Sequence, residues 1–183
     1  MPKRTNRRDL IVQTATELFG KNGYQATSTR QIAEAVGCTE AALYYHFKEG
    51  KQALLCAVMA ARMPEVQAVM DRCAQATSLK EALQLFGKRF EERTSGMRWL
   101  MMELSHLGDE ERAAVLEAFS AIRNGLVTVV RRFVPDETQA DRIAWLMFCI
   151  GVGYQQLFAE TVFQGQTDLS MQELMATLVG LMA

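Results

Sequence analysis

"TSTRQIAEAVGCTEAALYYHF", residues 27–47, holds two short helical patterns on either side of one glycine. Ser28 followed by Gln31 has the spacing of a capping box, in which each residue bonds a free backbone N–H of the other. Ile32 and Val36 lie one turn apart on the helix that follows. We therefore expect a helix of about two turns that begins after Ser28.

The second half of this stretch predicts another short helix that packs on the first. Gly37 ends the first pattern, and Thr39 is placed to cap a second one in which Leu43 and Phe47 lie one turn apart. Two short helices joined by a tight turn with a glycine are the helix-turn-helix pattern. In that pattern the second helix enters the major groove of DNA and the first braces it.

Four ring-bearing residues follow one another in the second helix, Tyr44, Tyr45, His46 and Phe47. Successive residues are about 100° apart around a helix axis, so one face cannot hold all four rings. Because Phe47 must turn inward to meet the first helix, we predict that it is buried and that Tyr45 and Glu40 face outward.

The rest of the chain also predicts helices. It has only three prolines, at positions 2, 64 and 135, and little of the apolar alternation that marks strands. The expected fold is all-α, with about nine helices and with Pro64 kinking or breaking the fourth. A first helix is expected at about 5–21, and helices beyond Pro64 at about 65–75, 79–94, 96–107, 109–134, 137–164 and 170–182.

Charge is distributed unevenly along the 183 residues, although the net charge is only -1. Residues 1–52 hold eight Lys or Arg and five Asp or Glu, a net charge of +3, and the remainder carries -4. A basic front end on an acidic body is expected when only the front end meets a polyanion.

Three blocks of the sequence resemble the N-terminal signature of the tetracycline-repressor-like (TetR) transcriptional regulators. "LFGKNGY", "TSTRQIAEAVG" and "LYYHF" followed by a lysine turn stand in this order from Leu18 to Lys51, in the first third of the chain. The resemblance implies a homodimer in the cytoplasm, with a DNA-binding domain at residues 1–50 and a helical effector-binding and dimerisation domain at 51–183. It also implies a repressor that binds a palindromic double-stranded operator and is released by a small-molecule effector, without a cofactor.

The resemblance assigns DNA contacts position by position. Arg30 sits where members reach a guanine, and the base-facing positions of the second helix are Glu40, Ala41, Ala42 and Tyr45. Phosphate-contacting positions are Thr29, Thr39, Tyr44, His46 and Lys51. An acid at position 40 departs from the family pattern, and our hypothesis is that Glu40 accepts a hydrogen bond from a cytosine amino group. The competing interpretations are that Arg30 is a solvated charge and that Tyr44 only packs.

The body of the chain offers candidates for an effector pocket. "MRWLMMELSHL", residues 97–107, is rich in methionine, which adapts to irregular shapes. The candidate lining residues carry few charges, which favours a neutral or lipophilic ligand; they are Met59, Met63, Phe86, Phe90, Trp99, Met102, His106, Trp145, Phe148 and Tyr154. The alternative is that these residues are plain core.

The last two helical patterns predict an isologous four-helix dimer interface from residues 137–164 and 168–182 of each chain. Residues 143–154 are apolar nearly all round, and the C-terminal pattern has one unbroken apolar stripe. The candidate interface residues are Ile143, Met147, Ile150, Tyr154, Met171, Leu174, Met175, Leu178 and Met182.

The sequence holds no motif of an enzyme or a metal site. There is no G-x-S-x-G, Walker or H-E-x-x-H motif, and the four cysteines form no C-x-x-C pair, so we expect no catalysis, no cofactor and reduced thiols. The basic N-terminus leads into no apolar run, and the longest uncharged stretch, 143–159, is shorter than a membrane span of ~20 residues. The alternative function is a non-catalytic helical adaptor whose helix-turn-helix docks protein.

Overall fold

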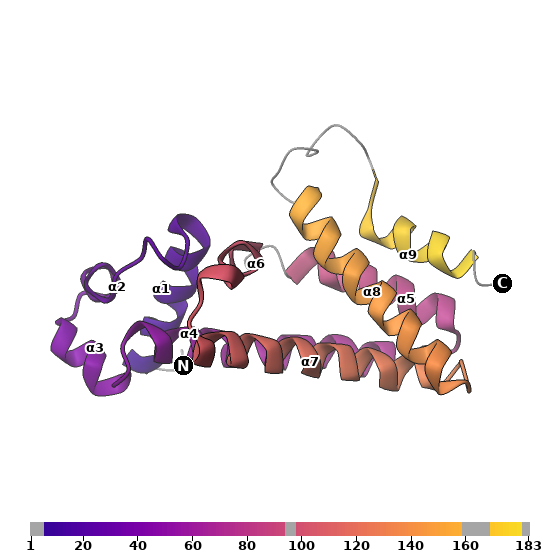
Figure 1. The fold of residues 1–183 in the computed structure, drawn as a ribbon, viewed down its shortest axis with the longest axis horizontal. Helices are drawn as coiled ribbons and strands as arrows, with labels where there is room; N and C mark the ends of the chain where they lie inside the picture. Colours follow the sequence, from indigo (N-terminus) through magenta and orange to yellow (C-terminus); the bar gives the residue numbers. More distant parts are fainter. Residues whose placement is uncertain (1–5, 94–97, 159–168, 181–183) are drawn as a thin grey trace, which may run out of the picture. The chain divides into compact units, whose positions relative to one another are not determined.

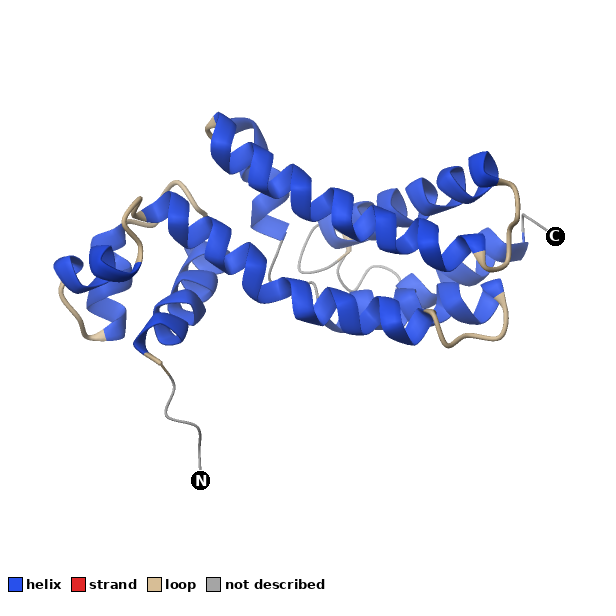
Figure 2. Cartoon of the chain, turned by 90° about the horizontal axis from the view of Figure 1, so that it is seen from below, coloured by secondary structure: helices blue, strands red, loops and turns tan. Residues whose placement is uncertain are grey.

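The computed structural model describes residues 6–93, 98–158 and 169–180, and every regular element in this part of the chain is a helix (Figures 1 and 2). The expectation of an all-α fold is confirmed. The α-helices are α1 Arg7–Asn22, α2 Thr29–Val36, α3 Glu40–His46, α4 Lys51–Cys73, α5 Leu79–Arg93, α6 Arg98–Glu103, α7 Asp109–Arg131, α8 Glu137–Leu157 and α9 Met171–Gly180, with a 3-10 turn, η2 Leu104–His106, between α6 and α7.

The chain forms two compact units. Met1–Met63 and Gly96–Ala118 make the first unit, and Pro64–Ser95 and Phe119–Ala183 make the second. The helix-turn-helix segment is therefore packed together with α6, η2 and the first part of α7. A functional division at residue 50 stays a prediction.

The core of the first unit forms where α1, α2 and α3 turn apolar residues toward one another. Ile11, Phe19, Ile32 and Leu43 are each fully buried. The Phe19 ring meets the Trp99 ring of α6, with 5.4 Å between the ring centroids. Full burial of such side chains stabilises a fold by roughly 1.5 to 3 kcal/mol each, so this cluster fixes how the three short helices pack.

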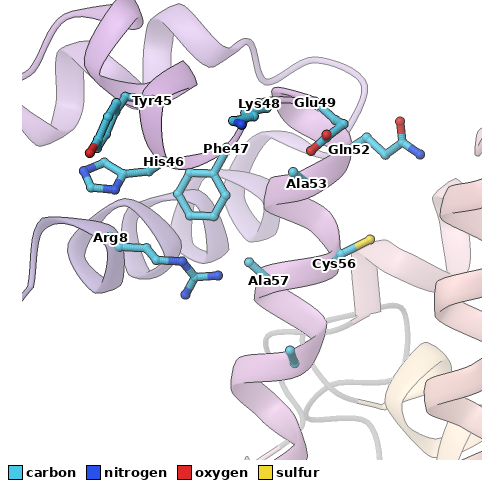
Figure 3. Close-up of a pocket in the computed structure, with 11 residues that line it drawn as sticks. Arg8, Tyr45, His46, Phe47, Lys48, Glu49, Gln52, Ala53, Cys56 and Ala57 are labelled. Atoms are coloured by element: carbon cyan, nitrogen blue, oxygen red, sulfur yellow. The ribbon is translucent and has the colours of Figure 1, made fainter.

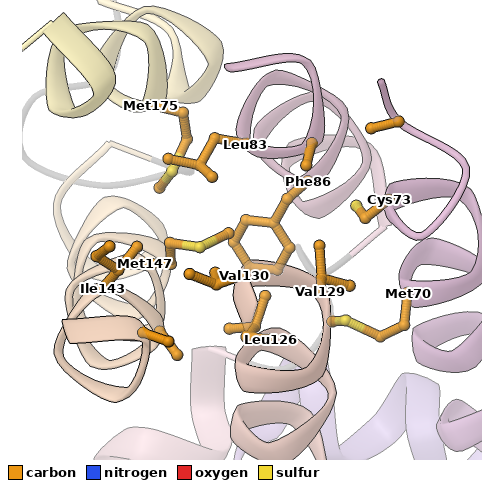
Figure 4. Close-up of a cluster of buried hydrophobic side chains, with 14 of the residues drawn as sticks. Met70, Cys73, Leu83, Phe86, Leu126, Val129, Val130, Ile143, Met147 and Met175 are labelled. Atoms are coloured by element: carbon orange, nitrogen blue, oxygen red, sulfur yellow. The ribbon is translucent and has the colours of Figure 1, made fainter. Parts of the chain in front are cut away.

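The second unit has its own core around Phe86 of α5, shown in Figure 4. Leu83, Leu126 and Met147 are fully buried in the same cluster. α9 packs on α5 at Gly87, where an added Cβ would lie 3.1 Å from the Met171 carbonyl oxygen. A small residue at position 87 therefore allows the close approach of these two helices.

Pro64 lies inside α4, so of the two expected outcomes, a kink or a break, the break is wrong. α4 runs from Lys51 through Pro64 to Cys73. Proline removes one backbone bond, the one to the carbonyl four residues earlier. Pro64 and Ala60 are both exposed, so water can reach that carbonyl and lower the cost of the lost bond.

Two helices of the described part, α4 and α7, are long and apolar enough to cross a bilayer by length and composition alone. The core helices of a soluble protein pass the same test, so this is weak support for a membrane role.

Gly37 tests whether backbone conformation holds the helix-turn-helix together. Its φ is 72°, and nothing lies within 4 Å of the position of an added Cβ, so a substitution there changes only the backbone preference. We predict that Gly37→Ala lowers the free energy of unfolding by about 1 to 2 kcal/mol in urea. Gly37→Asn should cost less, because asparagine tolerates a positive φ. Equal losses for the two variants would contradict this account.

Candidate nucleic-acid interface

The two helices of the motif begin and end where the local sequence signals predict. The Ser28 hydroxyl accepts from the Gln31 N–H, and the Gln31 carboxamide accepts from the Ser28 N–H at 2.7 Å, so the capping box is confirmed. Thr39 caps α3 by accepting from the Ala42 N–H at 3.2 Å. At Gly37 the left-handed backbone lets the next N–H, that of Cys38, bond back to the Ala33 carbonyl at 2.9 Å.

The rotation of α3 about its axis agrees with the prediction from its four rings. Leu43 and Phe47 are buried, whereas Tyr45 is 81% exposed and Tyr44 is 45% exposed. Tyr45 and the half-buried His46 meet edge to face, with 5.2 Å between their ring centroids. α3, a helix of seven residues, thus exposes the Tyr45 ring to solvent.

Arg8 is a basic residue near α3 to which the family pattern assigned no role. Its guanidinium lies 5.1 Å from the centroid of the Phe47 ring, a cation–π contact, and Figure 3 shows the two side chains extended toward each other. The same figure shows Lys48 beside the end of α3. Arg8 lies near the start of α1, and its partner Phe47 is distant in the sequence. No pattern in the sequence alone reveals this contact.

An open groove of about 600 Å³ runs between these residues and α4 (Figure 3). Ala53 and Ala57 of α4 line one part of it, and Arg8 and His46 line another. Small side chains on α4 leave this space, and the charged side chains lining it are Arg8, Lys48 and Glu49. The balance of charge there is positive.

Polar side chains at the start of α2 and α3 bond across the turn. The Thr29 hydroxyl and the Glu40 carboxylate are joined by a hydrogen bond of 2.9 Å. Arg30 pairs with Glu34 at 2.9 Å, and both side chains are well exposed. The hydrogen bond to Glu34 raises the pKa of Arg30, and the charges of Glu34 and Glu40 raise it further. Arg30 and Glu40 are thus electrostatic neighbours.

Lys51 is engaged within the chain. Its ammonium group donates to the carbonyls of Tyr24 at 3.1 Å and Gln25 at 3.4 Å, and it lies 4.5 Å from the centroid of the Tyr24 ring. These contacts fasten the start of α4 to the turn between α1 and α2. The predicted phosphate role for Lys51 therefore competes with a structural one.

The predicted DNA contacts lie on α2, on α3, in the turn between them and, in the case of Lys51, at the start of α4. Exposed members are Arg30, Thr39, Glu40, Ala41, Tyr44 and Tyr45, and half-buried members are Thr29, Ala42, His46 and Lys51. Their roles toward DNA stay predictions.

The candidate effector residues fall in both units. Met59, Trp99, Phe86 and Tyr154 are buried, Met63 and Phe148 are half-buried, and His106 and Trp145 are exposed, while the side chains of Phe90 and Met102 lie outside the described part. Trp99 stacks beside Tyr24, and Phe86 fills the core of the second unit, so both have packing roles of their own.

The candidate dimer residues lie mostly on the side of α8 and α9 that faces the chain's own core. Ile143, Met147, Tyr154, Met171 and Met175 are buried, Ile150, Leu174 and Leu178 are half-buried, and Met182 lies outside the described residues. The exposed large apolar residues of α8 are Trp145, Leu146 and Leu157. Which face of α8 meets a partner stays a prediction.

Residues 11–58 match the family described as bacterial regulatory proteins, tetR family. The HTH-type transcriptional repressor KstR2 of Mycolicibacterium smegmatis is 40% identical over 47 residues, 26% of this chain and 23% of that protein. The HTH-type transcriptional regulator TtgR of Pseudomonas putida is 29% identical over 158 residues, 75% of this chain and 73% of that protein. In the first curated relatives the match covers less than half of each protein's own length.

Solved structures share the fold. The transcriptional regulator FadR from Bacillus subtilis, solved in complex with stearoyl-CoA, superposes with a TM-score of 0.70 at 17% identity and covers 94% of this chain and 95% of that one. The matched segment is the one that folds into the capped α2, the left-handed turn and the outward-facing α3. Residues 11–58 thus carry the N-terminal domain of the tetR family of bacterial regulatory proteins, and the rest of the chain shares the fold of solved TetR-family regulators.

Proposed function

We propose that the protein is a transcriptional repressor that binds a palindromic DNA operator as a homodimer and is released by a small lipophilic effector. Residues 1–50 form the DNA-binding domain, and residues 51–183 bind the effector and the second copy. The observation that carries DNA binding is the outward orientation of α3, on which Tyr45 is 81% exposed. An aromatic ring with so little packing in its own chain is suited to contact a partner.

The charge around α3 supports nucleic acid as that partner. Arg8, Arg30 and Lys48 are exposed, and residues 1–52 carry a net +3 while the rest of the chain carries -4. Side chains on the outer face of α3 would reach base edges in the major groove, and the flanking cations and hydroxyls would bind phosphates. The named relatives, a repressor and a regulator, support the same role. We further propose that the protein acts in the cytoplasm and is not an enzyme.

Tyr45→Ala tests DNA binding directly. Because Tyr45 contributes little to the core, we expect a folded variant whose operator affinity falls by about 1 to 3 kcal/mol, measured by fluorescence anisotropy on an operator obtained by genomic selection. Wild-type affinity should also fall steeply between 50 and 200 mM salt, by roughly 10³-fold or more if six phosphates are neutralised. Thermal unfolding monitored by circular dichroism is the control for folding. An adaptor that docks protein would show neither effect.

The dimer is proposed to form through the outer face of α8 together with α9. Trp145, Leu146 and Leu157 are each nearly half exposed there, an apolar surface that a second copy would cover. The Arg123 guanidinium lies 5.3 Å from the centroid of the Trp145 ring and bonds to Asp141 of α8. The tryptophan is therefore held in place before a partner arrives.

Leu146→Arg tests this interface against an equally exposed leucine elsewhere. Leu146 is 48% exposed on α8, and Leu116 is 50% exposed on α7. We expect the Leu146→Arg variant to be monomeric by light scattering at micromolar concentration, because a charge would be buried without a partner at the interface. Leu116→Arg should stay dimeric. A monomeric wild type, or equal effects of the two variants, would exclude the proposed interface.

Release by an effector requires that the body of the protein act on the helix-turn-helix, and the turn between α1 and α2 offers a route. The Tyr24 hydroxyl donates to the Glu111 carboxylate, and the Gln25 side chain donates to the His106 carbonyl at 3.1 Å. A shift of the segment from Glu103 to Glu111 would therefore move the turn that leads into α2. A coupling of about 1 to 3 kcal/mol suffices for regulation. The stearoyl-CoA bound to FadR supports a lipophilic effector.

Tyr24→Phe tests the contact between Tyr24 and Glu111. Burial raises the pKa of the Tyr24 hydroxyl, and the hydrogen bond to Glu111 raises it further. Tyr24 therefore keeps its proton in the folded state at a pH where the unfolded chain, with a tyrosine pKa of about 10, has lost it. The unfolded state then binds fewer protons, so stability falls as pH rises above about 10.

We expect urea unfolding to show this fall in the wild type and a smaller one in Tyr24→Phe. Near neutral pH, Tyr24→Phe should cost about 1 to 3 kcal/mol, because the Glu111 carboxylate loses its hydrogen-bond donor. Parallel stability curves for the two proteins above pH 10 would show that Tyr24 is not protected.

A further inference from the structure

The acid at position 40 occupies an unfavourable place for a protein that binds DNA. Glu40 is the first residue of α3 and is exposed on the surface proposed to face the major groove. A free carboxylate near phosphates lowers the affinity for every DNA sequence, because it repels them. Most of the affinity comes from protein cations that neutralise the phosphate backbone. An acid is useful at such a place only if it accepts a hydrogen bond from a base.

The structure supplies a group that orients this acid. Thr29, the first residue of α2, donates its hydroxyl proton to Oε1 of Glu40 at 2.9 Å. A glutamate side chain has three rotatable bonds, and a bond from a neighbouring helix selects one arrangement of the carboxylate. An ionised carboxylate has about four acceptor sites on its two oxygens, so this bond leaves acceptor capacity for another donor.

Arg30 does not neutralise this carboxylate through a direct pair. The Arg30 guanidinium is hydrogen-bonded to Glu34 at 2.9 Å, one turn further along α2. The positive charge near Glu40 offsets the repulsion between the acid and phosphates but leaves the carboxylate free to accept. Glu40 forms no salt bridge with any residue that the structure describes, and an oriented, accessible carboxylate of this kind is suited to read the amino group of cytosine.

We propose that Thr29 is a positioning residue for base recognition, whose hydroxyl holds the Glu40 carboxylate where it accepts a hydrogen bond from the N4 amino group of a cytosine. This assignment replaces the phosphate contact predicted for Thr29 from the sequence. It rests on the proposed function, since it requires that α3 enter the major groove.

The test is a binding selection from a randomised operator library with the full-length protein. The wild type and Thr29→Ser, which keeps the hydroxyl, should enrich the same cytosine. Thr29→Val should lower the preference for that cytosine by about fivefold or more. Glu40→Gln should move the preference toward adenine, which a carboxamide pairs with. Thr128→Val, an exposed threonine on α7, is the matched control and should change nothing.

Background dependence separates positioning from a direct phosphate contact. In a Glu40→Ala background, Thr29→Val should leave base preference unchanged, because there is no carboxylate left to orient. If Thr29→Val instead lowers affinity equally for all sequences in both backgrounds, Thr29 contacts phosphate and the inference is overturned. The inference is also overturned if the wild type enriches an operator and Glu40→Gln shows the same base preference as the wild type. A wild type that enriches no sequence contradicts the proposed function itself.

Discussion

The burial of Leu43 and Phe47 is the constraint on which the surface proposed for DNA depends. α3 has seven residues, too few to be stable alone, so its position and rotation come from the two side chains that it buries. Those two side chains determine the direction of every other residue of the helix. Tyr45 lies between Leu43 and Phe47 in the sequence, and the burial of those two side chains turns it outward. The surface proposed for DNA is thus a consequence of packing on its opposite side.

The helix-turn-helix could be predicted from the sequence because short-range signals decide it. A capping box at Ser28, a glycine at 37 and a capping threonine at 39 each act within four residues, and each formed as predicted. The rotation of α3 followed from a steric argument about one short segment. Local chemistry leaves little freedom there.

Long-range contacts explain what the sequence did not reveal. Residues 143–154 of α8 are apolar nearly all round, so periodicity could not tell the face that packs in its own unit from the face left outside. The family resemblance placed Lys51 at a phosphate-contacting position but did not reveal that its ammonium also bonds carbonyls 26 and 27 residues earlier. The same holds for Tyr24 and Glu111, 87 residues apart, and for Arg8 over Phe47. Partners that are distant in sequence leave no local pattern.

The division of α3 into a buried side and an exposed side has an evolutionary consequence. Stability is concentrated in Leu43 and Phe47, and the outward residues at 40, 41 and 45 are exposed. Exposed positions away from caps and cores tolerate substitution with changes within about 0.5 kcal/mol. If these positions contact DNA as proposed, descendants of this chain can change their target site one residue at a time without first gaining stability elsewhere. The fold limits which positions can change specificity, and it places few limits on the base sequence that those positions recognise.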